Sequence, residues 1–365
     1  MTICDGASDF LMETDRKPLG VGFIGTGMIG QVAHLANFLN LPGCRIVGLA
    51  ELRPELGRKA AAKFGVPKVY ATHRELLADS EVGAVVVVTR RPATGPIVLE
   101  ALEAGRHVLS EKPMAHTVEQ ATRLVEAAVR HDLRYAVGFM KRHDAGTKMA
   151  KEILDELRGS GELGRILFVR AYCYGGEFKC AATDFVMTDE ARPDGLATWP
   201  SAPDWVPAEL VSDYAWFLNV FLHDLNILRY LMDRKPEVRA VELARRNGRL
   251  VNFDFGEFPA ILEMAEIPFT DWQEGVEILF ERGRLTLRFP SPMLRDVPAR
   301  VELTRAGQNP EKFVPRLGKS WAFRRQAEAF VADVAARREP LASGRDAVAD
   351  LCLAETIWRQ YLQNL

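Results

Sequence analysis

The sequence predicts an α/β protein with two sheets of different kinds. Apolar runs alternate with amphipathic stretches from residue 19 to residue 138, and a glycine-rich turn follows the first of these runs. Short alternating segments separated by turn residues dominate the second half. Alternating strands and helices predict βαβ units, and hence a parallel sheet covered by helices on both faces. The later segments predict a second, α+β region with a mostly antiparallel sheet.

The first half contains five expected strands with helices between them. Residues 19–24 are a short apolar run that ends at glycine, as a buried parallel strand does. The helix expected at 54–64 has proline in its first turn, and the one at 94–104 stops before a glycine. By the same patterns we expect strands at 45–50, 82–89, 106–109 and 134–138, and helices at 28–39 and 118–131.

The pattern changes near residue 141. A helix at 147–157 and a strand at 165–174 come before residues 175–211, which are rich in Gly, Pro, Asp and Trp and lack periodicity. A stretch of this length without regular structure predicts a functional loop. We then expect a helix at 214–232, strands at 238–244, 251–255, 260–267, 275–281, 284–289 and 300–304, and closing helices at 321–336 and 347–360.

The length of 365 residues predicts two domains. We place a first domain at 18–141 and a second, substrate-binding and oligomerisation domain at 142–365, whose last helices pack back on the first. Residues 1–17 are expected to be a disordered extension, because they lack both a signal-peptide pattern and a strong apolar pattern. No apolar run is long enough to span a membrane.

Composition excludes several partner classes. The chain has 47 Lys+Arg against 49 Asp+Glu, a formal net charge of −2. A nucleic-acid binder or a polybasic membrane-surface protein would show a basic excess. The five cysteines are scattered and form no Cys-x-x-Cys pair, so neither a zinc site nor a disulfide framework is expected. Cys173, Cys180 and His223 likewise fit no zinc spacing. Reduced thiols favour a cytoplasmic location.

The glycine-rich turn predicts dinucleotide binding. Gly25-Thr26-Gly27-Met28-Ile29-Gly30 follows an apolar strand and opens a helical stretch, which is the context that a G-x-G-x-x-G fingerprint requires. Gly25 permits the tight turn, Gly27 lets the backbone approach a pyrophosphate, and Gly30 lets the helix pack closely on the strand. The helix N-terminus then offers free N–H groups to the phosphates.

The second strand ends at an acid that points to the identity of the nucleotide. Glu51 stands where such folds bind the ribose hydroxyls, and a carboxylate there would repel a 2′-phosphate. This favours NAD. Arg53 lies two residues later and could hold that phosphate instead, so NADP is not excluded.

Further motifs resemble one family across most of the chain. Glu111-Lys112-Pro113 follows a strand that reads Gly-Arg-His-Val-Leu, downstream of the fingerprint. With Thr89, the Lys141-Arg142 pair, residues 161–166, His223 and residues 323–330, this combination resembles the Gfo/Idh/MocA oxidoreductases. The resemblance implies a Rossmann domain followed by a large, mostly antiparallel open sheet that pairs in homodimers or homotetramers. It also implies NAD-dependent oxidation or reduction of a carbinol in a sugar, a sugar derivative or a polyol, within carbohydrate metabolism.

The resemblance assigns catalytic roles to Lys112 and His223. The family's Asp-x-x-x-His-x-x-Asp motif corresponds here to Asn219, His223 and Asn226, so both acids are replaced. Histidine can accept or donate the hydroxyl proton near neutral pH. We therefore expect His223 to be the base and Lys112 to assist. Asn219 can only orient substrate, because an amide does not titrate, and Asp224 is expected to face elsewhere.

Several cations are expected at the same edge of the first sheet. Arg90 and Arg91 follow Thr89, and one of them is expected to contact the cofactor or an acidic group of the substrate. Thr89, Arg90 and Glu111 are expected to bind the cofactor. Arg142, with Lys141 as the second choice, is expected to contact substrate. Lys179 of the long loop, and Tyr174 just before that loop, are also expected to contact substrate. Such a cluster favours an anionic sugar, for example a uronate, a phosphate or a sulfonate.

Two other functions remain open. One is an NAD-dependent glycosidase that oxidises a carbinol transiently, eliminates, adds water and reduces again; its extra acid or base would be Glu177, Asp184 or Tyr174. The other is a regulator that senses NAD or a sugar without turnover. Tyr214, Trp199, Trp205 and Trp216 are expected to anchor the long loop more than to stack on a sugar.

Overall fold

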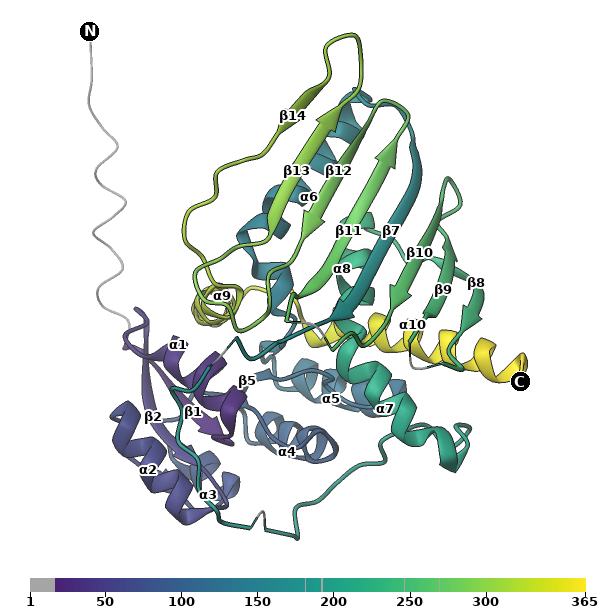
Figure 1. Ribbon diagram of the computed structural model, residues 1–365. Helices are drawn as coiled ribbons and strands as arrows, with labels where there is room; N and C mark the ends of the chain where they lie inside the picture. Colours follow the sequence, from purple (N-terminus) through teal and green to yellow (C-terminus); the bar gives the residue numbers. More distant parts are fainter. Residues whose placement is uncertain (1–16, 181, 192, 246, 269) are drawn as a thin grey trace, which may run out of the picture.

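Two sheets form the frame of the molecule, one below and one above in Figure 1. The computed structural model describes residues 17–365 except 181, 192, 246 and 269. The extension expected at 1–17 therefore lies outside the described residues, apart from Lys17. None of the described helices is both long enough and apolar enough to cross a membrane.

The first sheet has six parallel strands in the order β3-β2-β1-β4-β5-β6. The order reverses between β1 and β4, and the carboxyl ends at such a point form the crevice in which open α/β sheets bind ligands. The five expected strands are confirmed, and the two-residue β3 was too short to show in the pattern. The strands are β1 (Leu19–Ile24), β2 (Cys44–Ala50), β3 (Val69–Tyr70), β4 (Ala84–Val87), β5 (His107–Ser110) and β6 (Tyr135–Val137).

Helices cover both faces of this sheet. The expected helix at 28–39 contains a π-helical turn, η1 (Gly30–Leu35), followed by α1 (Ala36–Phe38). The sheet's other helices are α2 (Pro54–Phe64), α3 (His73–Ala78), α4 (Arg91–Glu103) and α5 (Val118–Arg130). Threonine side chains cap α3 and α5 by accepting a backbone N–H three residues later. The short α3 was not expected.

The second sheet has eight strands in the order β14-β13-β12-β11-β7-β10-β9-β8. All described neighbours are antiparallel except β7 and β10, which run parallel. The expectation of a mostly antiparallel sheet is thus confirmed, and the one parallel pair of described strands, β7 and β10, lies inside the sheet. The strands are β7 (Ile166–Gly175), β8 (Glu237–Glu242), β9 (Arg249–Asp254), β10 (Pro259–Met264), β11 (Gln273–Phe280), β12 (Gly283–Arg288), β13 (Arg300–Arg305) and β14 (Glu311–Phe313).

Helices on one face of the second sheet connect it to the first (Figure 1). The helix expected at 214–232 breaks at Phe221 into two. The C-terminal helix α10 packs against α5 and α8, and α9 packs against η1, α1 and η2. The division at residue 141 remains a prediction. The elements are η2 (Met140–His143), α6 (Ala145–Ser160), η3 (Ala208–Leu210), α7 (Val211–Val220), α8 (Leu222–Met232), α9 (Ala322–Ala336) and α10 (Gly344–Gln363).

A buried network of charges and amides joins η2, α8 and α10. Arg142 on η2 donates from Nε to Oδ1 of Asn226 (2.7 Å) and forms an ion pair with Asp346 (2.6 Å). Asn226 in turn donates to Asp350 (2.7 Å), which pairs with Arg229 (2.6 Å). Asp350 is fully buried. Because a buried charge is costly without its partner, this network fixes α8 relative to the first sheet.

A long irregular connection crosses the carboxyl edge of the first sheet. We call residues 176–207 the crossing segment; it runs in Figure 1 from the end of β7 past α1 and α2 and back to α7. Gln31 holds it by donating to the carbonyl of Val186 and accepting from its N–H. Trp199 packs on Gly95, whose added Cβ would lie 2.3 Å from the Trp199 ring. The long loop expected at 175–211 therefore crosses this edge and is held there at Val186 and Trp199.

Candidate active site

One large cavity lies between the two sheets at the carboxyl edge of the parallel one. Its volume is about 1270 Å³. Sites for a single small ligand usually span ~300–1,000 Å³, so this cavity has room for a dinucleotide and a second small molecule. The chain around the first sheet contributes the glycine turn, Glu51 and Lys112, and the later part of the chain contributes Asn219 and His223.

The glycine turn has the geometry that a pyrophosphate requires. Gly25 has a φ of +90°, and a Cβ there would lie 2.2 Å from the carbonyl oxygen of Val88. A Cβ on Gly30 would lie 2.5 Å from the carbonyl oxygen of Gly25. Gly27 lines the cavity, and a Cβ there would meet no atom within 4 Å. The fold requires glycine at positions 25 and 30, because a side chain there would clash with the backbone. Gly27 instead leaves open space for a ligand, so the turn fits a dinucleotide. Met28 and Ile29 line the cavity beside it.

Glu51 lies at the end of β2, where the ribose acid was expected. Its carboxylate accepts hydrogen bonds from the N–H and the hydroxyl of Thr26, both at 2.9 Å, and from Nε of Arg53 at 2.8 Å. Burial opposes ionisation, but these donors and the Arg53 charge lower the pKa of Glu51. Glu51 is therefore an anion at neutral pH, and Arg53 is paired with it.

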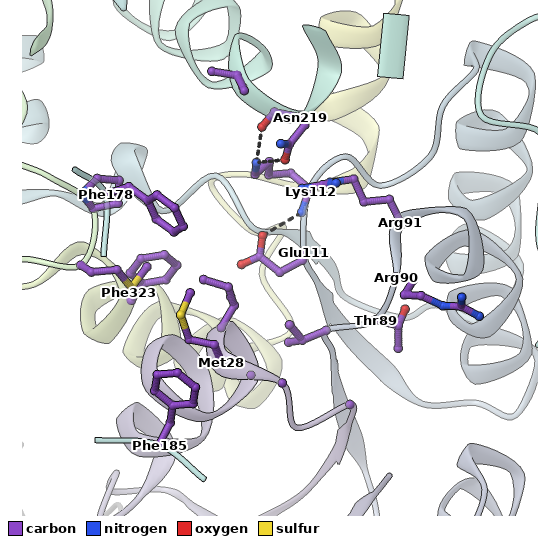
Figure 2. A pocket seen from close by; sticks show the side chains of 18 of the residues that line it. Met28, Thr89, Arg90, Arg91, Glu111, Lys112, Phe178, Phe185, Asn219 and Phe323 are labelled. Carbon is purple, nitrogen blue, oxygen red and sulfur yellow. Dashed lines mark hydrogen bonds between the residues drawn. The ribbon is translucent and has the colours of Figure 1, made fainter. Parts of the chain in front are cut away.

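Lys112 reaches across the cavity to the second half of the chain. Its Nζ donates to the backbone carbonyl and to Oδ1 of Asn219, as Figure 2 shows. Its neighbour Glu111 accepts from the ring of His34 (2.7 Å) and from the N–H of Lys112. Burial lowers the pKa of Lys112 to about 8, and the charges of Arg91 and Lys141 act in the same direction against that of Glu111. For Glu111, burial opposes ionisation, yet the bond to His34 lowers its pKa.

His223 lines the same cavity from α8. Its ring packs edge-on against Phe139, with ring centroids 5.8 Å apart. Its Nδ1 is buried and has no hydrogen-bond partner in the described part of the chain. Burial, and after it the charges of Lys112 and Lys141, hold the pKa of His223 well below its usual range. His223 is therefore neutral throughout the neutral pH range.

A buried charge cluster lies behind His223. Sγ of Cys173 and carboxylate oxygens of Asp224 and Glu274 lie within 4.8 Å of one another. Lys141 donates to Glu274, and its charge acts on both Cys173 and Asp224. Burial raises the pKa of Asp224 to about 6. We assign no metal to this group, because the Lys141 ammonium already supplies its positive charge and would repel a metal ion. Asp224 is buried in this cluster, away from the cavity lining.

Comparison with known proteins identifies the first half. Residues 19–139 match the model of the Gfo/Idh/MocA oxidoreductase family, NAD-binding Rossmann fold. This part of the chain therefore matches the NAD-binding Rossmann fold of that family.

Relatives extend this likeness in part. An inositol 2-dehydrogenase from Burkholderia lata is 33% identical over 201 residues, which cover 53% of this chain and 57% of that protein. An inositol 2-dehydrogenase/D-chiro-inositol 3-dehydrogenase from Shouchella clausii is 41% identical over 176 residues, 46% of this chain and 49% of that protein. The chain thus aligns with only about half the length of these relatives.

The whole fold resembles that of a solved structure. A levoglucosan dehydrogenase in complex with NADH and levoglucosan superimposes with a TM-score of 0.74. The alignment covers 96% of this chain and 98% of that one at 18% identity. A likeness at this identity establishes the fold, a Rossmann sheet followed by a large, mostly antiparallel sheet.

The cavity contains some of the cations expected from the sequence and not others. Arg91, at the first turn of α4, extends toward Lys112, whereas Arg90 points away from it (Figure 2). Both line the cavity with Thr89. Arg91 has no hydrogen bond or ion pair to any residue that the structure describes. Lys141 lines the cavity, so the second choice at this pair is the one that reaches the site.

Three expected substrate contacts lie outside the cavity lining. Arg142 is committed to Asn226 and Asp346, as the buried network shows. The hydroxyl of Tyr174 bonds Glu263, because alternate residues of β7 point to opposite faces of the sheet. Lys179 is exposed on the crossing segment. The structure thus places these three residues away from the cavity lining, and their contact with substrate stays a prediction.

Glu177 and Asp184, two acids of the crossing segment, also lie outside the lining. Glu177 is exposed and accepts from the N–H of Lys179, and Asp184 pairs with Lys63. With Tyr174 bound to Glu263, none of the three residues expected as the extra acid or base of a glycosidase lines the cavity.

Several lining residues escaped the sequence analysis. Trp216, expected as an anchor, lines the cavity and donates to Glu266 (2.7 Å), and Trp272 donates to Glu274 (2.9 Å). Phe178 and Phe323 form an aromatic wall opposite Lys112 (Figure 2). Trp199 and Trp205 do anchor, on Gly95 and beneath Arg359. The wall joins segments far apart in sequence, so no local pattern could reveal it.

The two cavity-facing glycines predict different mutant behaviour. Gly27→Ala should leave the unfolding midpoint unchanged but weaken NAD binding about tenfold or more, because its methyl group enters only the ligand space. Gly25→Ala should also lower the midpoint, because it combines a left-handed φ with a clash against Val88. Titration calorimetry and thermal denaturation separate the two effects. Unchanged NAD affinity in Gly27→Ala would contradict the placement of the dinucleotide.

Proposed function

We propose that this protein is an NAD-dependent oxidoreductase acting on a carbinol of a sugar, a sugar derivative or a polyol. The observation that carries the proposal is that Lys112 and His223 face one cavity with the glycine turn and Glu51. The inositol dehydrogenases that resemble about half of the chain support a cyclic polyol or a sugar as substrate. The bound nicotinamide would accept the hydride of the carbinol carbon, or return it in the reverse reaction.

Lys112 is the group best suited to exchange the hydroxyl proton. His223 was the expected base, but its protonation would add a third positive charge beside Lys112 and Lys141. Lys112 has a pKa of about 8, so it can change its protonation state near neutral pH. In oxidation the neutral amine takes the hydroxyl proton, and in reduction the ammonium returns it. His223 and Asn219 then orient the hydroxyl by hydrogen bonds.

The lining supports an anionic ring as the preferred substrate. Arg91 and Lys141 lie close enough to Lys112 for their charges to act on it, and Lys141 but not Arg91 is paired with a carboxylate of a described residue. Trp216 and Phe178 offer aromatic faces of the kind that pack on sugar rings. A uronate or a phosphorylated polyol would satisfy both features, and a neutral inositol would use the second alone.

Neither alternative function has a specific supporting observation. A glycosidase would need a further acid or base in the cavity, and the three expected candidates do not line it. A sensor without turnover would not require the lowered pKa of Lys112 beside a carbinol site. The dehydrogenase is therefore the function that we propose.

We also propose a cytoplasmic homo-oligomer formed through the second sheet. The described cysteines at 44, 173, 180 and 352 are free thiols, and reduced thiols are usual in proteins of a reducing compartment. Helices α6 and α8 cover one face of the sheet (Figure 1), and the other face presents Arg170, Tyr172 and Tyr174, all half-buried. Analytical ultracentrifugation should give the mass of a dimer or a tetramer; a monomer at micromolar concentration would contradict this proposal.

Lys112→Met should lower turnover by about 10²–10⁴-fold, the usual contribution of a positioned acid or base. The assay follows reduced nicotinamide with a panel of inositols, neutral sugars and uronates. NAD affinity should change little, because the nucleotide contacts of the glycine turn remain. Lys179→Met is the matched control, since Lys179 is exposed outside the cavity lining and its loss should leave turnover unchanged. Full turnover in Lys112→Met would rule out this role.

The rate of oxidation should rise with pH through about 8 and then level off. Below that value Lys112 is an ammonium and cannot accept the hydroxyl proton; above it the amine can. Reduction should show the opposite slope, because it needs the protonated form. The pH profile of kcat/KM in each direction tests this. An inflection near the usual histidine pKa, and none near 8, would contradict the role of Lys112 and indicate that His223 exchanges the proton.

A further inference from the structure

The crossing segment brings an acid to the nucleotide half of the cavity. Besides the Gln31 contacts, Asp184 pairs with Lys63 of α2, and Glu190 reaches the start of α2. Glu190 lines the cavity together with Glu51 and Arg53. A residue from between β7 and α7 thus lies beside the end of β2, more than a hundred positions earlier in the chain. Neither the glycine fingerprint nor the acid expected at the end of β2 would predict that Glu190 lies there.

Glu190 occupies the N-terminus of α2. One of its carboxylate oxygens accepts from the N–H of Glu55 (2.9 Å) and the other from the N–H of Leu56 (2.8 Å). Thr188 donates its hydroxyl to the second oxygen (3.0 Å). The helix has no cap of its own, because the N-cap residue Arg53 makes no side-chain cap hydrogen bond. Glu190 therefore fills the anion position that free N–H groups at a helix start create.

The N-terminus of α2, beside Arg53, is also where the 2′-phosphate of NADP would find hydrogen-bond donors. In Rossmann folds the acid at the end of β2 binds the ribose hydroxyls, and a nearby arginine accommodates the extra phosphate of NADP. Here Arg53 is paired with Glu51 (2.8 Å), and the adjacent N–H groups are taken by Glu190. A phosphate would have to displace one carboxylate and lie beside another.

We propose that Glu190 is a specificity-determining residue that, together with Glu51, selects NAD and rejects NADP. Glu51 acts from the sheet and Glu190 from the crossing segment. The inference rests on the proposed nucleotide site. Its test needs no substrate turnover, so its outcome is independent of whether the proposed dehydrogenase reaction is correct.

Glu190 has to be charged to act in this way. Burial opposes its ionisation, but the N–H groups of Glu55 and Leu56 lower its pKa, and the charge of Arg53 acts in the same direction. A phosphate that approached the same N–H groups would lie next to the Glu190 carboxylate, and two negative charges at short range repel each other. The purely structural alternative, in which Glu190 only anchors the segment, predicts equal effects on both nucleotides.

The test compares nucleotide binding in Glu190→Gln with that in the unchanged protein. Glutamine keeps the size and one accepting oxygen but removes the charge. Titration calorimetry with NAD and with NADP, without substrate, gives the two Kd values. We expect Glu190→Gln to bind NADP at least about tenfold more tightly than the unchanged protein does, while the Kd for NAD changes by about twofold or less. Asp184→Asn is the matched control: it breaks another contact of the segment, with Lys63, and should leave the NAD-to-NADP ratio unchanged.

Equal weakening of both nucleotides in Glu190→Gln would reduce Glu190 to an anchor and overturn the proposal. So would a preference of the unchanged protein for NADP. If the variant does not fold, the unchanged protein still decides. Raising the salt concentration screens repulsion between charges and should narrow the difference between the two Kd values; a ratio that does not depend on salt would refute the electrostatic origin.

Discussion

The buried network around Arg142 is the constraint on which the site depends. Lys112 comes from the first sheet and His223 from α8, and the two face one cavity only while α8 keeps its place. Arg142, Asn226 and Asp350 tie η2 to α8 and α10 inside the protein. Such a network is sensitive to its partners, because the loss of one leaves another charge buried alone. It therefore sets one arrangement of the two halves.

Positive charge in the cavity follows from that arrangement and sets its chemistry. Burial is the main reason that protonation of Lys112 and His223 is unfavourable, and the positive charge of Lys141 adds to it at both residues. The pKa of Lys112 falls to about 8, and His223 remains neutral. Two residues that look like interchangeable acid–base groups in the sequence are thus given different roles by their surroundings.

The crossing segment joins the nucleotide half of the cavity to the substrate half. It supplies Phe178 near Lys112 and Glu190 at the start of α2. The second half of the chain thereby contributes to nucleotide recognition, which the alternation of strands and helices assigns to the first half alone. A segment without periodicity can do this because its backbone is held at separate points by Gln31, Trp199 and Glu190.

The sequence by itself determined the features that depend on local geometry. Gly25 is required by its own φ, and Glu51 follows from its place at the end of an apolar strand, so both could be predicted. Tertiary structure decided the features that depend on distant partners. The short η2 turn directs Lys141 into the cavity and Arg142 into the network, although the two are neighbours in sequence. Glu190 meets α2 only because the chain folds back over the sheet, and a local pattern carries no record of contacts made by backbone and side chains so far apart along the chain.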